Sequence, residues 1–260
     1  MSFYSHREIV ASCSLPWYQY QVDPYIGCEH RCHYCYAQND AETDWEREIK
    51  VHTALKPRLL QETAALEPQL IYMGMNSDPY QPAEAQLHQT RKVLEVLVEK
   101  EFSVCILTKS SLVTRDIDLF SEMPGTSVGV SIAFNDEYTR KRFEPKAPPN
   151  DERIEALKRL KDAGIETYVM ICPVMPFLTD VQRVMERVAP YADTIWVYKL
   201  SMHSEKDKNW QKVYSILQRD FPEIAEQFQE IVFSDSHPYW DKIREDLVEI
   251  CKDTVLEVHV

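Results

Sequence analysis

Short apolar segments alternate with amphipathic segments from residue 69 onward, and this alternation restricts the fold more than any other feature of the sequence. The apolar segments are rich in β-branched residues and are as long as typical buried strands, whereas the segments between them have helical periodicity. Consecutive strand–helix units build a parallel sheet with helices on its outside. We therefore expect an α/β fold with strands at residues 18–25, 69–75, 102–108, 126–134, 166–172 and 194–200.

Helices between these strands are indicated by apolar residues that recur every three or four positions. They are expected at residues 54–66, 85–100 and 151–163. The last of them should begin at Asn150, which is a good capping residue, and should end at Gly164. Thr179 and Gln182 have the spacing of a capping box, which predicts the start of the next helix along the chain.

About six strand–helix units can be counted, fewer than the eight of a complete TIM barrel, so we predict a partial (βα)6 barrel. Residues 201–260 break the rhythm with two helical stretches, at 207–229 and 238–251, and a final apolar segment. Because no Pro-, Gly- or Ser-rich linker precedes them, they are expected to form a C-terminal helical cap packed on the barrel. Residues 1–200 would then form the barrel with an N-terminal extension.

The charge balance restricts the partners of the chain. It has 29 Lys and Arg against 42 Asp and Glu, a net charge of −13, which disfavours binding to duplex DNA. The stretch 140–146 is basic although the chain as a whole is acidic. It could bind an anion, but a solvated surface is the favoured interpretation. No segment approaches the roughly 20 apolar residues of a membrane span, and the N-terminus lacks an apolar signal core. A cytoplasmic protein without a membrane partner is expected.

Three cysteines lie close together, at Cys28, Cys32 and Cys35, while Cys13, Cys105, Cys172 and Cys251 are scattered. In a reducing compartment such a cluster indicates metal ligation and not a disulfide framework. The CxxxCxxC spacing lets a tight loop bring three thiolates around one inorganic centre. Three protein ligands would leave one iron of a 4Fe–4S cluster open to a further ligand. The loop is therefore expected to hold a catalytic centre and not a purely structural one.

A zinc site is the alternative interpretation of this loop. The three cysteines together with His30 or His33 would suit zinc, because thiolate and imidazole are both good zinc ligands. The protein would then be a metal-binding interaction module with a purely structural site. The strand–helix units favour the iron–sulfur cluster, since small zinc modules do not need a barrel.

The cysteine spacing, with Tyr34 directly before the last cysteine, resembles that of the radical S-adenosylmethionine (SAM) superfamily. Further segments resemble its spore photoproduct lyase-like branch, whose members are often described as DNA repair photolyase-like. These segments are residues 23–28, 35–37, 77–84, 108–110, 115–116, 144–145 and 173–176.

The resemblance implies that the three cysteines bind a 4Fe–4S cluster and that SAM binds its open iron. One electron, from a reductant such as flavodoxin or ferredoxin, would split SAM into methionine and a 5′-deoxyadenosyl radical, which takes a hydrogen atom from an unidentified substrate. By the same resemblance Lys109 binds the SAM carboxylate, and Ser77, Asp78 and Ser131 contact its methionine and ribose parts. A simple turn at 77–79 and a solvated strand end at Lys109 are the structural alternatives.

Two residues are candidates for catalysis itself. In spore photoproduct lyase a cysteine just ahead of the SAM-binding serine returns a hydrogen atom to the product, but Met75 stands in this stretch here, and a thioether has no S–H to give. Cys172 could replace that donor, although a small buried hydrophobe is the favoured interpretation. Tyr36 is a second candidate for the cavity wall. We expect lyase- or transferase-type chemistry on another substrate, with a true DNA photoproduct lyase as the alternative.

Overall fold

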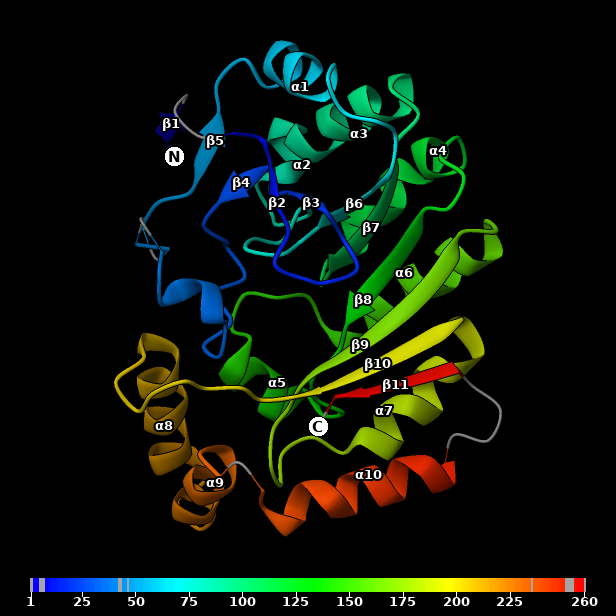
Figure 1. Cartoon of the computed structure of the whole chain (residues 1–260). Coiled ribbons are helices and arrows are strands. Elements are labelled where there is room, and N and C mark those ends of the chain that lie inside the picture. Colours follow the sequence, from blue (N-terminus) through cyan, green and yellow to red (C-terminus); the bar gives the residue numbers. More distant parts are fainter. Residues whose placement is uncertain are drawn as a thin grey trace.

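One large sheet organises the structure, a computed structural model that describes residues 2–4, 8–41, 44–45, 47–234, 236–250 and 255–259 (Figure 1). Within these ranges the sheet has eight strands in the order β11-β10-β9-β8-β7-β6-β3-β2. Every neighbouring pair is parallel except β2 and β3. The strands are β2 (Val10–Ser12), β3 (Tyr20–Val22), β6 (Leu70–Met73), β7 (Ser103–Thr108), β8 (Ser127–Ser131), β9 (Glu166–Val174), β10 (Thr194–Lys199) and β11 (Val255–His259).

Helices cover the outer face of this sheet (Figure 1). A small second sheet of order β1-β5-β4 lies near the N-terminus, with β1 at Ser2–Tyr4, β4 at Tyr25–Ile26 and β5 at Lys50–His52. The α-helices are α1 (Leu55–Thr63), α2 (Glu84–Leu87), α3 (Gln89–Glu99), α4 (Ile117–Phe120), α5 (Glu137–Phe143), α6 (Asn150–Asp162), α7 (Val181–Val188), α8 (Lys208–Asp220), α9 (Ala225–Val232) and α10 (Pro238–Ile250). Short 3₁₀ turns are η1 (Tyr36–Gln38), η2 (Ser111–Asp116) and η3 (Ala189–Tyr191). None of the helices in the described ranges is both long and apolar enough to cross a bilayer.

The strands place alternate side chains on the two faces of the sheet, as the period of two requires. One set, which includes Val104 and Ile106, packs under the helices and forms the core. The other set points into the barrel, where Tyr72, Cys105 and Tyr168 form a separate buried cluster. The interior is therefore lined by large side chains, and the functional cavity lies beyond them at one end of the strands.

The six strands predicted from the sequence are confirmed, each within a few residues. The predicted helices are also present, but two of them are interrupted. His88 adopts a left-handed conformation with φ of 51°, which separates α2 from α3 within the segment 85–100. The stretch 207–229 breaks at Phe221, directly before Pro222, into α8 and α9, because a proline cannot supply the amide of a continuing helix.

Two capping predictions are wrong, although α6 does end just before Gly164, which has φ of +77°. Asn150 is the first residue of α6 and not its cap, because its side-chain amide donates to the carbonyl of Phe134 at 2.6 Å. Thr179 does not cap α7, since its hydroxyl donates to the carbonyl of Ala133 at 2.9 Å. The cap is the adjacent Asp180, whose carboxylate accepts from the amide of Arg183 at 3.0 Å.

The C-terminal segment contains more than helices. Strand β11 pairs in parallel with β10 and so continues the large sheet by one strand, which the sequence analysis did not predict. Helix α10 packs on the sheet near it, with Trp240 in the core of β9 and β10. The division of the chain at residue 200 remains a prediction, and Cys251 lies outside the described residues.

Candidate functional site

A cavity of about 590 Å³ lies at the carboxyl ends of the parallel strands. In barrels of this type the active site is found at that end. Cys28, Cys32 and Cys35, in the loop that follows β4, form part of its wall. The opposite parts of the wall come from the strand ends and contain the other predicted site residues, which are Ser77 and Asp78 after β6, Lys109 after β7, Ser131 on β8 and Cys172 on β9. All the predicted site residues, Tyr36 included, thus meet at one cavity.

The three cysteines are free thiols, with Cys28 and Cys32 buried and Cys35 half-buried. Burial raises the pKa of each thiol, and that of Cys32 reaches about 12. A bound cation would reverse this effect, because a coordinating thiol loses its proton. Within the described ranges, no three His, Cys, Asp or Glu side chains lie close enough to share one metal ion. A cubane cluster does not require this, since each thiolate binds a different iron atom.

The cysteine loop is fixed by side chains from the segment that follows β6. The Gln81 side chain accepts from the amide of Glu29 at 2.9 Å and donates to the carbonyl of Gly27 at 3.0 Å. In return, the carboxylate of Glu29 accepts from the amide of Ala83 at 2.6 Å. The sequence of the segment 77–84 indicates only a resemblance, whereas the structure shows that this segment holds the cysteine loop in place.

Ser77 and Asp78 line the cavity, but their side chains also bond to the protein. The Ser77 hydroxyl donates to the carbonyl of Tyr25 at 2.9 Å. The Asp78 carboxylate accepts from the Thr108 hydroxyl at 2.6 Å and from the Lys109 amide at 2.8 Å, and it lies 3.3 Å from His30. Burial would raise the pKa of Asp78, but His30 and these hydrogen bonds outweigh it and lower the pKa to about 2. The segment is therefore held firmly between β6 and β7.

Lys109 and Ser131 form a polar pair on the same wall. The Lys109 ammonium donates to the Ser131 hydroxyl at 3.1 Å and lies 5.7 Å from the ring centre of Tyr34. Burial acts to lower the pKa of Lys109, but Cys32 and Glu144 raise it overall. An ammonium group has three donors, and Ser131 uses one of them. Lys109 thus presents a stable positive charge beside the cysteine loop, which excludes the alternative of a freely solvated strand end.

A buried charge network behind this wall was missed by the sequence analysis. The Tyr34 hydroxyl donates to Glu144, and Glu144 forms an ion pair with Arg153, both side chains being fully buried. Arg153 also donates to the carbonyl of Ser131 at 2.8 Å. The network therefore joins the cysteine loop to the strand that carries Ser131.

The basic stretch 140–146 is neither an anion site nor simply a solvated surface. Arg140 is buried and donates to Glu137 and to the carbonyl of Ala147, each at 2.8 Å. Arg142 pairs with Asp220 at 3.2 Å, which ties α5 to the end of α8. These two cations stabilise the fold, while Lys141 and Lys146 are exposed.

The two candidates for catalysis differ in exposure. Cys172 is half-buried in the cavity wall, where burial raises its pKa to about 11. Tyr36 is 49% exposed, and its hydroxyl donates to the carbonyl of Met75 at 2.5 Å. Both are accessible from the cavity, whereas Cys105 is buried between Tyr18 and Tyr168.

Comparisons with known proteins agree with this arrangement. The sequence profile of the radical SAM superfamily matches residues 22–188. The uncharacterized protein MJ0683 of Methanocaldococcus jannaschii is 33% identical over 216 residues, which is 82% of this chain and 80% of the relative. A radical SAM Nalpha-GlyT isomerase of Pseudomonas phage M6 is 26% identical over 121 residues, or 45% of this chain and 25% of that protein.

Among solved structures, spore photoproduct lyase has the same fold. A mutant of that enzyme aligns with a TM-score of 0.72 and 17% identity, covering 100% of this chain and 82% of the lyase. Another mutant, determined with bound AdoMet and a dinucleoside spore photoproduct, aligns with a TM-score of 0.66 and 17% identity over 100% of this chain and 82% of that one. The profile match spans most of the chain and includes the cysteine loop, so the chain belongs to the radical SAM superfamily.

Proposed function

We propose that this protein is an enzyme that binds a 4Fe–4S cluster through Cys28, Cys32 and Cys35 and uses it to cleave SAM reductively. The observation that carries the proposal is that three free thiols and a half-buried cation, Lys109, line the same cavity. The volume of about 590 Å³ falls within the range of roughly 300–1,000 Å³ that small-molecule sites occupy. When bound, the cluster and SAM would supply a 5′-deoxyadenosyl radical that takes a hydrogen atom from the substrate.

The residues of the wall have separate proposed roles. Lys109 would bind the carboxylate of SAM through the ammonium donors that Ser131 does not use, because a charge-assisted hydrogen bond is strong in an enclosed site. Ser131 would fix the position of that ammonium. Ser77 and Asp78 would lie against SAM, but their main role would be to hold the wall in shape, since their side-chain oxygens already bond to the protein. The protein thus supplies binding and orientation.

Cys172 and Tyr36 are the proposed catalytic residues. Cys172 is the one thiol of the cavity wall outside the cysteine loop, among the described residues, and it would give a hydrogen atom to a product radical. Tyr36 lies directly after Cys35 and faces the same cavity. We propose a substrate other than spore photoproduct, because the stretch that resembles the donor stretch of the lyase contains Met75 and no cysteine, and the net charge of −13 opposes duplex DNA.

Anaerobic reconstitution with iron and sulfide tests the proposal against the zinc alternative. We expect about four irons per chain, as a cubane requires, a broad visible absorption that fades on reduction, and release of 5′-deoxyadenosine when SAM and dithionite are added. Incubation with zinc alone serves as the control. A chain that takes up one zinc, refuses iron and leaves SAM intact would show that the loop is a structural site.

A further inference from the structure

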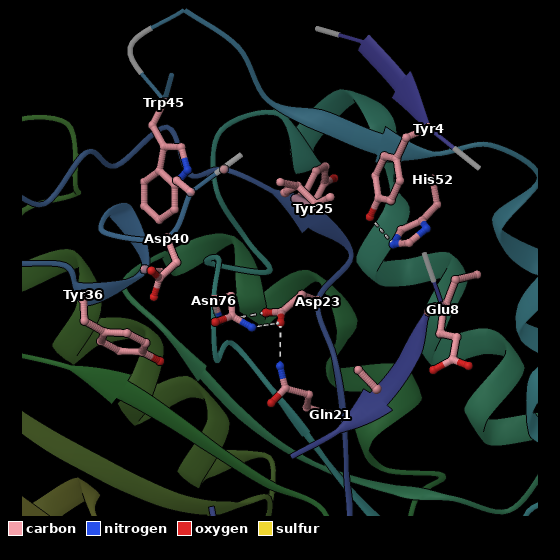
Figure 2. Close-up of a pocket in the computed structure, with 16 residues that line it drawn as sticks. Tyr4, Glu8, Gln21, Asp23, Tyr25, Tyr36, Asp40, Trp45, His52 and Asn76 are labelled. Carbon is pink, nitrogen blue, oxygen red and sulfur yellow. Dashed lines mark hydrogen bonds between the residues drawn. The ribbon is translucent and has the colours of Figure 1, made fainter. Parts of the chain in front are cut away.

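A second cavity, of about 310 Å³, adjoins the large one on the side of the small sheet (Figure 2). The two cavities share Tyr36, Trp45 and Asn76 as wall residues. We refer to this second cavity as the side chamber. No role for it follows from the proposed cluster and SAM site, because the cysteine thiols and Lys109 do not line it.

Trp45 gives the side chamber an unused hydrogen-bond donor. The Trp45 side chain is 8% exposed, and its indole N–H is buried without a hydrogen-bond partner in the described part of the chain. Figure 2 shows the indole nitrogen on the side of the ring that faces the middle of the chamber. A buried donor without an acceptor is unfavourable, so such groups are usually explained by a ligand or water. A ligand in the chamber should therefore carry an oxygen that accepts a hydrogen bond from the Trp45 indole N–H.

The charged residues of the chamber are acidic. Glu8 and Asp40 line it with exposed carboxylates, and neither has an ion-pair partner among the described residues. Asp23 is not available to a ligand, because its two oxygens already accept hydrogen bonds from Gln21, from Asn76 twice and from the amide of Ser77. Of the described wall residues, none is a lysine or an arginine. The chamber thus attracts a cation.

We propose that the side chamber binds a protonated amine whose chain carries an oxygen two carbon atoms away from the nitrogen. Asp40 attracts the ammonium group, the rings of Tyr36 and Trp45 flank it, and the Trp45 N–H donates to the oxygen. Glu8 lies on the opposite side of the chamber (Figure 2) and adds only to its negative charge. Aromatic faces favour cations in such positions. The assignment of this amine to the substrate rests on the proposed function, because Tyr36 lies at the boundary with the catalytic cavity. Binding of the amine itself does not depend on the cluster.

Fluorine NMR of the full chain containing 5-fluorotryptophan tests this proposal with ethanolamine as the probe. The chain has five tryptophans, and Trp45→Phe identifies the Trp45 signal. We expect ethanolamine to shift that signal saturably while the other four move little. Ethylene glycol, which lacks the charge, and ethylamine, which lacks the oxygen, should each bind more weakly. Equal binding of ethylene glycol, or no selective shift of Trp45, would overturn the proposal.

Matched variants then separate the carboxylates from general charge effects. Asp40→Asn should weaken ethanolamine binding roughly threefold to tenfold, a modest effect because exposed charges are screened. Glu8→Gln, on the opposite side of the chamber (Figure 2), should weaken it less. Asp44→Asn is the control, since Asp44 lies on the same loop, is exposed and does not line the chamber. Unchanged affinity in Asp40→Asn would contradict the proposal. Iron content and SAM cleavage, measured on the same samples, show independently whether the proposed function holds.

Discussion

The hydroxyl of Tyr34 donates a hydrogen bond to the buried carboxylate of Glu144. Tyr34 stands between the second and third cysteines of the loop, and Glu144 is paired in turn with Arg153. An isolated buried charge is unfavourable, so each member of this pair depends on the other. The cysteine loop is thereby attached to helix α6, which is far from it in sequence.

Removal of the Glu144 charge should therefore destabilise the whole fold. Glu144→Gln keeps a similar shape but leaves Arg153 buried without a counter-charge, and the free energy of unfolding should fall by about 3–5 kcal/mol. Urea unfolding followed by circular dichroism measures this. The control is Glu137→Gln, whose pair with Arg140 is partly exposed, and for which a loss of about 1 kcal/mol or less is expected. Equal effects of the two variants would show that the buried pair has no special role.

Lys109→Ala should weaken SAM binding without loss of the cluster. The lost contact is a charge-assisted hydrogen bond to a carboxylate, so the affinity should fall roughly tenfold to a hundredfold. Isothermal titration of the reconstituted protein with SAM measures it, and the iron content is measured in parallel. Lys199→Ala serves as the control. Lys199 also lines the cavity, at the end of β10, but its ammonium is engaged elsewhere, 5.6 Å from the centre of the Trp240 ring. If Lys109→Ala binds SAM like the wild type, Lys109 is not the SAM ligand.

A methyl group at Gly129 should damage the barrel interior. A Cβ atom built there would lie 2.2 Å from the ring of Tyr168, which stacks on Trp196 with ring centres 4.6 Å apart. Gly129→Ala should lower the free energy of unfolding by about 1–3 kcal/mol, the usual cost of overpacking a core. Gly125→Ala is a comparison in which the backbone conformation is strained but the nearest atom is 4.0 Å away. A melting temperature unchanged in Gly129→Ala would mean that Tyr168 can move aside freely.

An oligonucleotide that carries the spore photoproduct should not be repaired by this enzyme. Met75 lies in the stretch that resembles the donor stretch of the lyase and has no S–H to give, and the net charge of −13 disfavours contacts to phosphate. We expect slow release of 5′-deoxyadenosine without conversion to thymines, measured by chromatography after anaerobic incubation with SAM and dithionite. Complete repair that disappears in Cys172→Ala would instead make Cys172 the donor of a true lyase.

Much of the fold follows from local sequence patterns. The strands from residue 69 onward are short, apolar and separated by amphipathic helices, so that their order and approximate ends could be predicted. Strand β11 could not, because its five residues acquire a sheet partner only through β10. The cap of α7 was misplaced by one residue, since the hydroxyl of Thr179 bonds to a distant carbonyl that the sequence does not reveal.

The site was predictable where a motif carries its own chemistry. The cysteine spacing identified the loop, and the resemblance pointed to Lys109 and Ser131, which the structure brings within 3.1 Å of each other. The pairing of Glu144 with Arg153 could not be foreseen, because a charged residue in the first turn of a helix is normally solvated. Trp45 was missed for a similar reason, as its loop is polar and acidic and predicts only a surface segment.

The proposed function depends on the cysteine loop, and iron content in single cysteine variants tests it most directly. Cys28→Ala, Cys32→Ala and Cys35→Ala should each lose the cluster and SAM cleavage together after anaerobic reconstitution, because three thiolates are the minimum that the loop supplies. Cys13→Ala and Cys105→Ala are the matched controls and should retain both, and the same is expected for Cys251→Ala. A full complement of iron in any one of the three loop variants would contradict the proposed cluster site.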